Sequence, residues 1–330
     1  MRFEVLPIIA EAYRSHPLHG PSRIWCETNC AADLWIEALH ALGAEPLAAL
    51  AFTFSTDFDG DQWRMFKHPA EDLRRLFGIE VAELNVWRPL VHHVAEQVGM
   101  GRLVTVDVDA WHLPDTAGLT YRCAHQKTTV MVQMIDVEAR RLGYFHNSGY
   151  FELEGEDFDA LFAENRSSVL APYVESIRLD RFDPADAAVR AVALELFGEH
   201  LERRPPTNPV ARMGRRLRLD LPWLQASGLE MFHRYAFGTL RQCGANAELA
   251  AAFLSWLRAL EPRGAWSPRA LEIAAQRFNA IAAGMKSLEL SVARTVSRGK
   301  ACDLDTAFGQ LTRCWDEAYG LLERKPCHAG

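Results

Sequence analysis

The chain has 330 residues, of which 49% are hydrophobic and 24% charged, and its formal net charge is −7. This composition is typical of a globular protein and excludes a collagen, a coiled coil and a disordered chain. The negative charge argues against a nucleic-acid partner, because such proteins present basic surfaces. No run approaches the roughly 20 apolar residues of a membrane span, and the first residues lack a signal-peptide pattern. We therefore expect a cytoplasmic protein.

Domain organisation follows from length and residue usage. The length predicts about two domains, at roughly 100–200 residues each. Segments rich in β-branched and aromatic residues are mixed with helical patterns in the first half, whereas helix-forming residues dominate from about residue 184. We therefore expect an α+β domain over residues 1–180 and a helical domain or lid over residues 181–330. The seven cysteines are scattered, which is not a disulfide framework.

Residues 30–42 are predicted to form an amphipathic helix, because apolar side chains recur at helical spacing. Thr28 and Asn29 are suitable caps before its first turn, and Gly43 is suited to end it. Strands are expected at 47–54, 103–108, 128–135 and 142–147, where β-branched and aromatic residues gather.

Five segments of the second half carry helical periodicity, at 185–201, 229–243, 247–260, 268–297 and 304–322. A proline-containing loop at 203–208 precedes a basic run of four arginines: Arg212, Arg215, Arg216 and Arg218. Such a run is either a solvated helix face or a positive patch for an acidic partner.

Cys30 is the strongest candidate for chemistry, because it opens the predicted helix at 30–42. A thiol in the first helical turn lies at the positive end of the helix dipole, which stabilises the thiolate. The N–H groups that point outward there also bind an oxyanion. A nucleophilic cysteine needs both contributions. The alternative is that Cys30 is a small buried hydrophobic residue.

A nucleophilic thiol also needs a general base, and three histidines lie at or near the ends of predicted strands: His112, His125 and His146. His125 enters the longest β-rich run, and Asn147 ends the next one. A cysteine on an early helix, a histidine opening a strand and an amide ending the next strand follow the order of papain-like sites. Cys30, His125 and Asn147 are therefore predicted as a catalytic triad.

The strands at 128–135 and 142–147 are expected to pair as an antiparallel hairpin around residues 136–141. Symmetric closure places Asn147 opposite Val130 and His125 opposite Glu152. A β-bulge near residues 126–128, or a bend at Gly149, would then be needed to bring His125 and Asn147 together. Glu152 is kept as a reserve partner to orient the histidine.

Metal binding is an alternative for the same region. Cys26, Cys30, Cys123 and His125 are four residues of the types that bind zinc, although their spacing is not typical. Asp107, Asp109 and Asp115 could offer carboxylates to a cation or an amine, or simply face solvent from an edge strand. A calcium loop is excluded at 57–68, because position twelve is His68 instead of glutamate. Phosphate-binding and dinucleotide-binding glycine motifs are absent from the sequence.

Four segments resemble a bacterial family of unknown function, namely residues 27–30, 108–116, 125–129 and 143–147. The resemblance extends over most of the chain. More distantly, the first half is similar to the amino-terminal domain of butirosin biosynthesis protein H, a papain-like acyltransferase that moves an acyl group from an acyl carrier protein to an amine. Both have a cysteine opening a helix, an Asp-x-aromatic-x-Leu-Pro stretch (here Asp109 to Pro114) and a histidine before an apolar strand.

The resemblance implies a papain-like fold, with Cys30 as nucleophile, His125 as general base and Asn147 as its orienting partner. It also implies an oxyanion site and pocket formed by Asn29, Asp109, Trp111, His112 and Thr128. The relative carries its histidine directly at the strand start, where this chain has Thr128, and tends to end the next strand in aspartate instead of Asn147.

The expected function is a cysteine-dependent acyl or aminoacyl transferase. It would take the acyl group from a carrier-protein thioester through a Cys30 thioester and pass it to a small-molecule amine. The phosphopantetheine arm belongs to the carrier protein, so no cofactor of the chain itself is expected. The alternatives are a thiol hydrolase (a peptidase or amidase) with the same triad, and a non-catalytic binding module on a papain-like scaffold. A homodimer is compatible with each of them.

Overall fold

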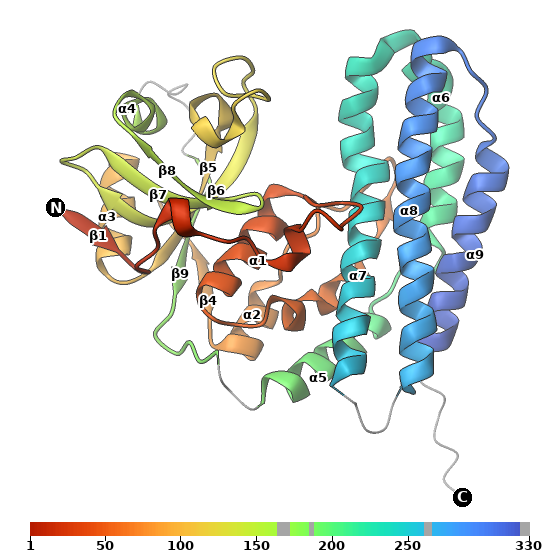
Figure 1. Ribbon diagram of the computed structural model, residues 1–330, viewed down its shortest axis with the longest axis horizontal. Helices are drawn as coiled ribbons and strands as arrows, with labels where there is room; N and C mark the ends of the chain where they lie inside the picture. Colours follow the sequence, from red (N-terminus) through yellow and green to blue (C-terminus); the bar gives the residue numbers. More distant parts are fainter. Residues whose placement is uncertain (164–171, 185–187, 261–265, 324–330) are drawn as a thin grey trace, which may run out of the picture. The chain divides into compact units, whose positions relative to one another are not determined.

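The computed structural model describes residues 1–163, 172–184, 188–260 and 266–323 (Figure 1). The chain divides into two compact units. The first comprises Met1–Pro21, Asn29–Pro46 and His68–Val189, and the second comprises Ser22–Thr28, Leu47–Lys67 and Arg190–Gly330. The first unit mixes helices with an antiparallel sheet, and the C-terminal half of the chain is helical.

The first unit is built on a seven-stranded sheet with the order β4-β9-β5-β6-β7-β8, in which β1 also pairs with β6. Neighbouring strands are antiparallel throughout. Its strands are β1 (Arg2–Glu4), β4 (Glu80–Glu83), β5 (Leu103–Asp109), β6 (Lys127–Asp136), β7 (Arg141–His146), β8 (Gly149–Glu154) and β9 (Val174–Arg178). The strands predicted at 103–108, 128–135 and 142–147 are therefore confirmed.

Two helices pack with the sheet's most apolar face. Val106, Val130 and Tyr144 belong to one buried cluster with side chains of α3 (Leu90–Gly99) and α4 (Glu156–Phe162). Because successive side chains of a strand point to opposite faces, even-numbered residues of β5, of β7 and of the first part of β6 share this face.

Helix α1 (Cys30–Ala41) packs against β6, β7 and β8 on the opposite face. The ring of Tyr13 marks this face, because it contacts the rings of Phe145 on β7 and Tyr150 on β8. The hydroxyl of Tyr13 donates to Glu37 of α1 at 2.6 Å. The N-terminal segment therefore links α1 to the odd-numbered side of β7. A further helix, α2 (Ala70–Phe77), completes this unit.

A β-bulge changes the register that symmetric closure predicts for β6 and β7. Asp136 pairs with Arg141 as expected, but the register shifts between Val132 and Met134, and Met131 then pairs with Phe145. Symmetric closure would instead place Met131 opposite His146. The expected pairing of Asn147 with Val130 is therefore wrong by one residue, and the bulge lies closer to the hairpin turn than residues 126–128.

The strand expected at residues 47–54 is wrong. Pro46–Ser55 forms a 3-10 helix instead. The segment is apolar on all sides and contains no polar alternation, so its pattern cannot distinguish a buried strand from a buried helix. In the second unit the ring of Phe54 contacts the aromatic rings of Phe197, Phe253, Phe278 and Tyr319. Burial of this aromatic cluster stabilises the 3-10 helix in its place within the second unit.

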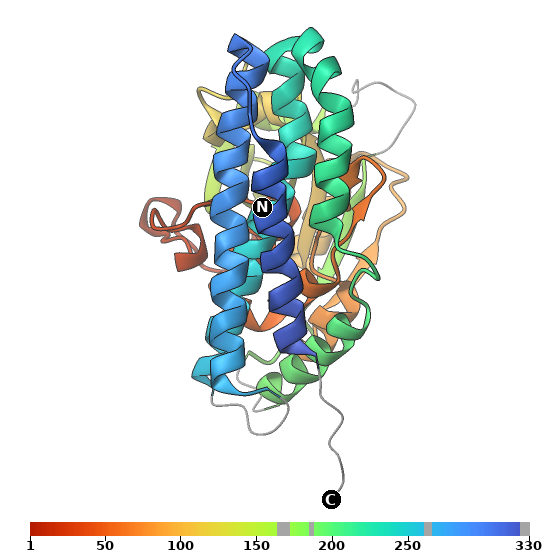
Figure 2. The same cartoon turned by 90° about the vertical axis from the view of Figure 1, so that its right-hand side faces the viewer.

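The second unit consists mainly of helices, of which α6, α8 and α9 run side by side (Figures 1 and 2). They are α5 (Val189–Glu202), α6 (Pro209–Ala236), α7 (Gln242–Ala259), α8 (Pro268–Arg298) and α9 (Leu304–Leu322). A π-helical turn, Phe237–Arg241, joins α6 to α7, and a short hairpin of β2 (Phe58–Asp59) and β3 (Gln62–Trp63) also belongs here. The start expected at residue 185 lies outside the described residues.

Helix α6 contains both the first part of the helix expected at 229–243 and the basic run of four arginines. The helix expected at 229–243 is the end of α6 and its continuation, with non-helical backbone at Gly228. The basic run lies within α6, and three of its four arginines are neutralised by Asp57, Asp220 and Asp305. The run is therefore not a free positive patch. Among the described helices, none combines the length and the apolar character needed to cross a bilayer.

Candidate functional site

Cys30 is the first residue of α1, as predicted. The residue before it, Asn29, is the helix cap, since its side-chain oxygen accepts the N–H of Ala32 at 2.9 Å and its carbonyl accepts the N–H of Asp33 at 3.0 Å. No residue that the structure describes accepts a hydrogen bond from the N–H groups of Cys30 and Ala31. The half-buried thiol of Cys30 thus lies beside two free N–H groups at the positive end of α1.

His125 is held by a carboxylate that the expected triad did not assign to it. Its Nδ1 lies 2.7 Å from Oδ2 of Asp109, the last residue of β5, and its ring stacks on Trp111 with centroids 4.4 Å apart. The other oxygen of Asp109 accepts the N–H groups of Trp111 and Gln126. Burial opposes ionisation of Asp109, but these bonds outweigh it and hold the pKa of Asp109 below its usual value.

The carboxylate of Asp109 selects the tautomer of the neutral histidine. A carboxylate only accepts hydrogen bonds, so Nδ1 of His125 carries the hydrogen and Nε2 is left with a lone pair when the ring is neutral. The side chain of His125 is 72% exposed, which leaves Nε2 accessible. A histidine with a carboxylate on Nδ1 and an open Nε2 has the arrangement of a general base.

This pair belongs to the α1 side of the sheet. Asp109 has the parity of Thr105 and Asp107, whereas Val106 and Val108 belong to the cluster on the opposite face. Asp107 has the same orientation and binds the hydroxyl of Thr129 at 2.7 Å. The alternation of β5 therefore puts the carboxylate of the His125–Asp109 pair on the face that α1 covers.

His146 forms a second histidine–carboxylate pair on the other face of the sheet. Its Nδ1 lies 2.6 Å from Asp115, and its Nε2 lies 2.8 Å from the hydroxyl of Thr128. Asp115 also accepts the hydroxyl of Tyr144 at 2.6 Å. The side chains of His146 and Asp115 are 2% and 4% exposed. Because both ring nitrogens are engaged and buried, this arrangement is suited to fixing structure.

Asn147 and Glu152 occupy other places in the sheet than the expected triad assigned to them. Asn147 lies in the two-residue turn between β7 and β8, with φ of 46°. The carboxylate of Glu152 binds Arg141 at 2.6 Å, and Glu152 pairs with Gly143 in the sheet, so the expected position of Glu152 opposite His125 is wrong. His112 ends the short 3-10 helix Ala110–His112.

A third histidine–carboxylate cluster was not predicted from the sequence. His19 is bonded through its two ring nitrogens to Glu37 and, at 3.2 Å, to Asp33, and all three side chains are at most 1% exposed. Burial lowers the pKa of His19, but the two carboxylates outweigh it and raise the pKa to about 9. Asp33 and Glu37 stand four residues apart on the buried side of α1, and this spacing was the available signal.

The zinc alternative gains no support from this geometry. Among the residues that the structure describes, no group of three or more histidines, cysteines, aspartates or glutamates could hold a metal ion. Cys123 donates its thiol to the carbonyl of Leu119 at 3.1 Å.

The fold and the site define a two-unit protein with a candidate thiol centre on its α+β unit. The chain belongs to the DUF1839 family, a family of unknown function. The model of the DUF1839 N-terminal domain matches residues 14–179, and the model of the DUF1839 C-terminal domain matches residues 186–324. The comparison with curated proteins gave no match.

Proposed function

We propose that the first unit is a cysteine-dependent acyl or aminoacyl transferase that accepts its acyl group from a carrier-protein thioester. One observation supports this most strongly: a thiol opens a capped helix on the same face of the sheet as a histidine that is oriented by a carboxylate. The distant resemblance of the first half to a papain-like acyltransferase supports a carrier-protein thioester as the acyl donor and a papain-like scaffold for the first unit.

In this proposal Cys30 is the nucleophile. Its thiolate attacks the thioester carbonyl, and the N–H groups of Cys30 and Ala31 stabilise the oxyanion of the tetrahedral intermediate. The side-chain oxygen of Asn29 serves as the helix cap, so we assign Asn29 a positioning role. Collapse of the intermediate expels the carrier thiolate, which takes up a proton, and leaves the acyl group on the sulfur of Cys30.

The second half-reaction assigns His125 as general base and Asp109, instead of Asn147, as its orienting partner. An incoming amine attacks the Cys30 thioester, Nε2 of His125 takes the proton of the amine, and the Cys30 thiolate leaves. Asp109 stabilises the imidazolium that forms. Trp111 restricts the imidazole by stacking. The amine receives the acyl group, and His125 returns to its neutral form by losing the proton to solvent.

The test is the intact mass of the protein after exposure to an acyl-pantetheine thioester. The native chain is expected to gain one acyl group, and Cys30→Ala is expected to gain none. Cys123→Ala is the matched control, because Cys123 is an exposed thiol of the same unit, and it should acylate like the native chain. Acylation that persists in Cys30→Ala, or that appears in no variant, would overturn the proposal.

The acceptor distinguishes transferase from hydrolase. After acylation, glycinamide is added at increasing concentration, and amide and free acid are quantified. Amide formation that rises with glycinamide concentration supports acyl transfer, whereas release of free acid alone identifies a thiol hydrolase. Acyl groups presented on a carrier protein should react faster than the same groups on free pantetheine.

A further inference from the structure

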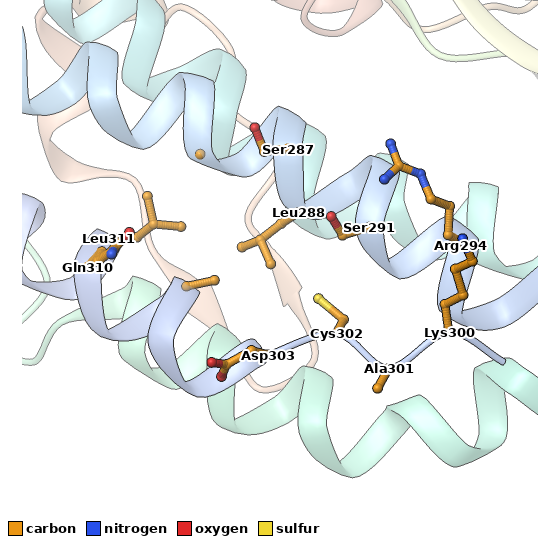
Figure 3. A pocket seen from close by; sticks show the side chains of 12 residues that line it. Ser287, Leu288, Ser291, Arg294, Lys300, Ala301, Cys302, Asp303, Gln310 and Leu311 are labelled. Atoms are coloured by element: carbon orange, nitrogen blue, oxygen red, sulfur yellow. The ribbon is translucent and has the colours of Figure 1, made fainter.

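We propose that the cleft between α8 and α9 of the second unit binds a small organic anion through a phosphate or carboxylate head group. The cleft encloses about 510 Å³. It is bounded by the last turns of α8, the first turns of α9 and the connecting segment that contains Lys300 and Cys302 (Figure 3). This inference is independent of the proposed acyl transfer.

Side-chain size explains why a cleft forms here. At one end the helices touch closely, because a Cβ added to Gly284 would lie 2.4 Å from a methyl carbon of Leu311. Towards the connecting segment the lining contains the small residues Ser287, Ser291 and Ala307. These short side chains leave the space between α8 and α9 unfilled at this end.

Two cations define one end of the cleft. Arg294 and Lys300 line that end (Figure 3). Neither forms an ion pair with any residue that the structure describes. Elsewhere in the same unit arginines are paired, for example Arg216 with Asp220 and Arg234 with Glu230. With Asp303 as the one carboxylate among the described residues that line the cleft, these two cations leave the cleft with an excess positive charge, which attracts an anion. A guanidinium offers two parallel donors to an oxyanion.

The rest of the lining limits the ligand to a short chain behind its anionic head. Leu288 provides an apolar floor, and Ser291 offers a hydroxyl next to it (Figure 3). Burial and the charge of Asp303 raise the pKa of Cys302, so its thiol stays neutral and does not repel an anion. Asp303 uses its carboxylate to cap α9 through the N–H of Thr306 at 3.0 Å.

The test uses Cys302 as a reporter, because it lines the cleft. Alkylation of Cys302 by iodoacetamide is followed by peptide mass in the full chain, with glycerol 3-phosphate, succinate or chloride at matched ionic strength. A ligand at ten times its dissociation constant is expected to slow this labelling about tenfold. Labelling of Cys314, another half-buried cysteine of this unit, should not change.

Charge-matched variants separate site binding from general screening. The double variant Arg294→Gln, Lys300→Gln should lose the protection. The control double variant Arg215→Gln, Arg269→Gln also removes two exposed cations, but these do not line the cleft, so it should keep the protection. Protection by glycerol 3-phosphate alone identifies a phosphate site, and protection by succinate alone identifies a carboxylate site. Equal labelling in all three salts, or protection that survives the Arg294 and Lys300 changes, would overturn the proposal.

Discussion

The His125–Asp109 and His146–Asp115 pairs have the same chemistry but opposite environments. Both place a carboxylate within 2.7 Å of Nδ1. On the α1 face, the exposed His125 keeps Nε2 open, whereas on the other face the buried His146 has Nε2 engaged with Thr128. Burial and the second partner, rather than the pair itself, therefore decide which histidine is available for proton transfer.

Removal of the exposed ring of His125 should affect catalysis and leave stability almost unchanged. His125→Ala is expected to lower the rate of acyl transfer from Cys30 to an amine by about 10²–10⁴-fold, the usual contribution of a general base. Stability should change by about 0.5 kcal/mol or less, because the side chain is largely solvated. Single-turnover kinetics and urea unfolding measure the two effects. A rate equal to that of the native chain would remove His125 from the mechanism.

Removal of the buried histidine of the His146–Asp115 pair should instead lower stability. His146→Ala leaves Asp115 buried with the hydroxyl of Tyr144 but without the histidine, and the expected loss is about 3 kcal/mol of unfolding free energy, measured in urea. His146→Gln should recover part of this loss, because its amide can still donate to Asp115. If the alanine variant is as stable as the native chain, the pair has no structural role.

The buried cluster of His19, Asp33 and Glu37 should make stability depend on pH. The pKa of His19 is raised from 6.5 to about 9 in the folded protein, because the hydrogen bonds and charges of Asp33 and Glu37 outweigh burial. Its contribution to stability is therefore complete below pH 6.5 and is lost as the pH rises to about 9. The expected loss is on the order of 3 kcal/mol. Unfolding curves of the native chain and His19→Gln should converge across this interval, and parallel curves would contradict it.

The smallest effect is expected at Asn147. With φ of 46° in a two-residue turn, this residue has a conformation that asparagine and glycine tolerate better than alanine. Asn147→Ala should cost about 1 kcal/mol of stability and Asn147→Gly should cost little. Acyl transfer should be unchanged in both, when measured below their unfolding midpoints. A large kinetic defect in Asn147→Gly would restore Asn147 as the orienting residue.

The sequence predicted the helix at Cys30, its Asn29 cap and the central strands β5, β6 and β7, because each depends on local patterns. The partner of His125 could not be predicted in the same way. Asp109 meets His125 only because β5 and β6 pair in a particular register across the intervening loop, and residue types do not encode that register locally.

The bulge in β6 illustrates the same limit. A single extra residue at Gln133 changes which residues of β6 and β7 are opposite each other. Gly143 of β7 pairs with Met134 beside the bulge, but a single glycine within a strand does not fix where the register shifts. The expected pairing of His125 with Glu152 failed for another reason: the chain turns back after His146, so Glu152 belongs to β8 and pairs with Gly143. The parity of β5 was available in the sequence, since valines alternate with Asp107 and Asp109, and it would have favoured Asp109 as a residue away from the apolar face.

The most direct test of the account is the intact mass of the native chain and His125→Ala during one turnover with an acyl-pantetheine thioester and glycinamide. We expect one acyl group on Cys30 in both proteins, rapid loss of that group to the amine in the native chain, and its persistence in the variant. Equal rates of deacylation in both proteins, or an acyl group on another residue, would contradict the assignment of Cys30 and His125.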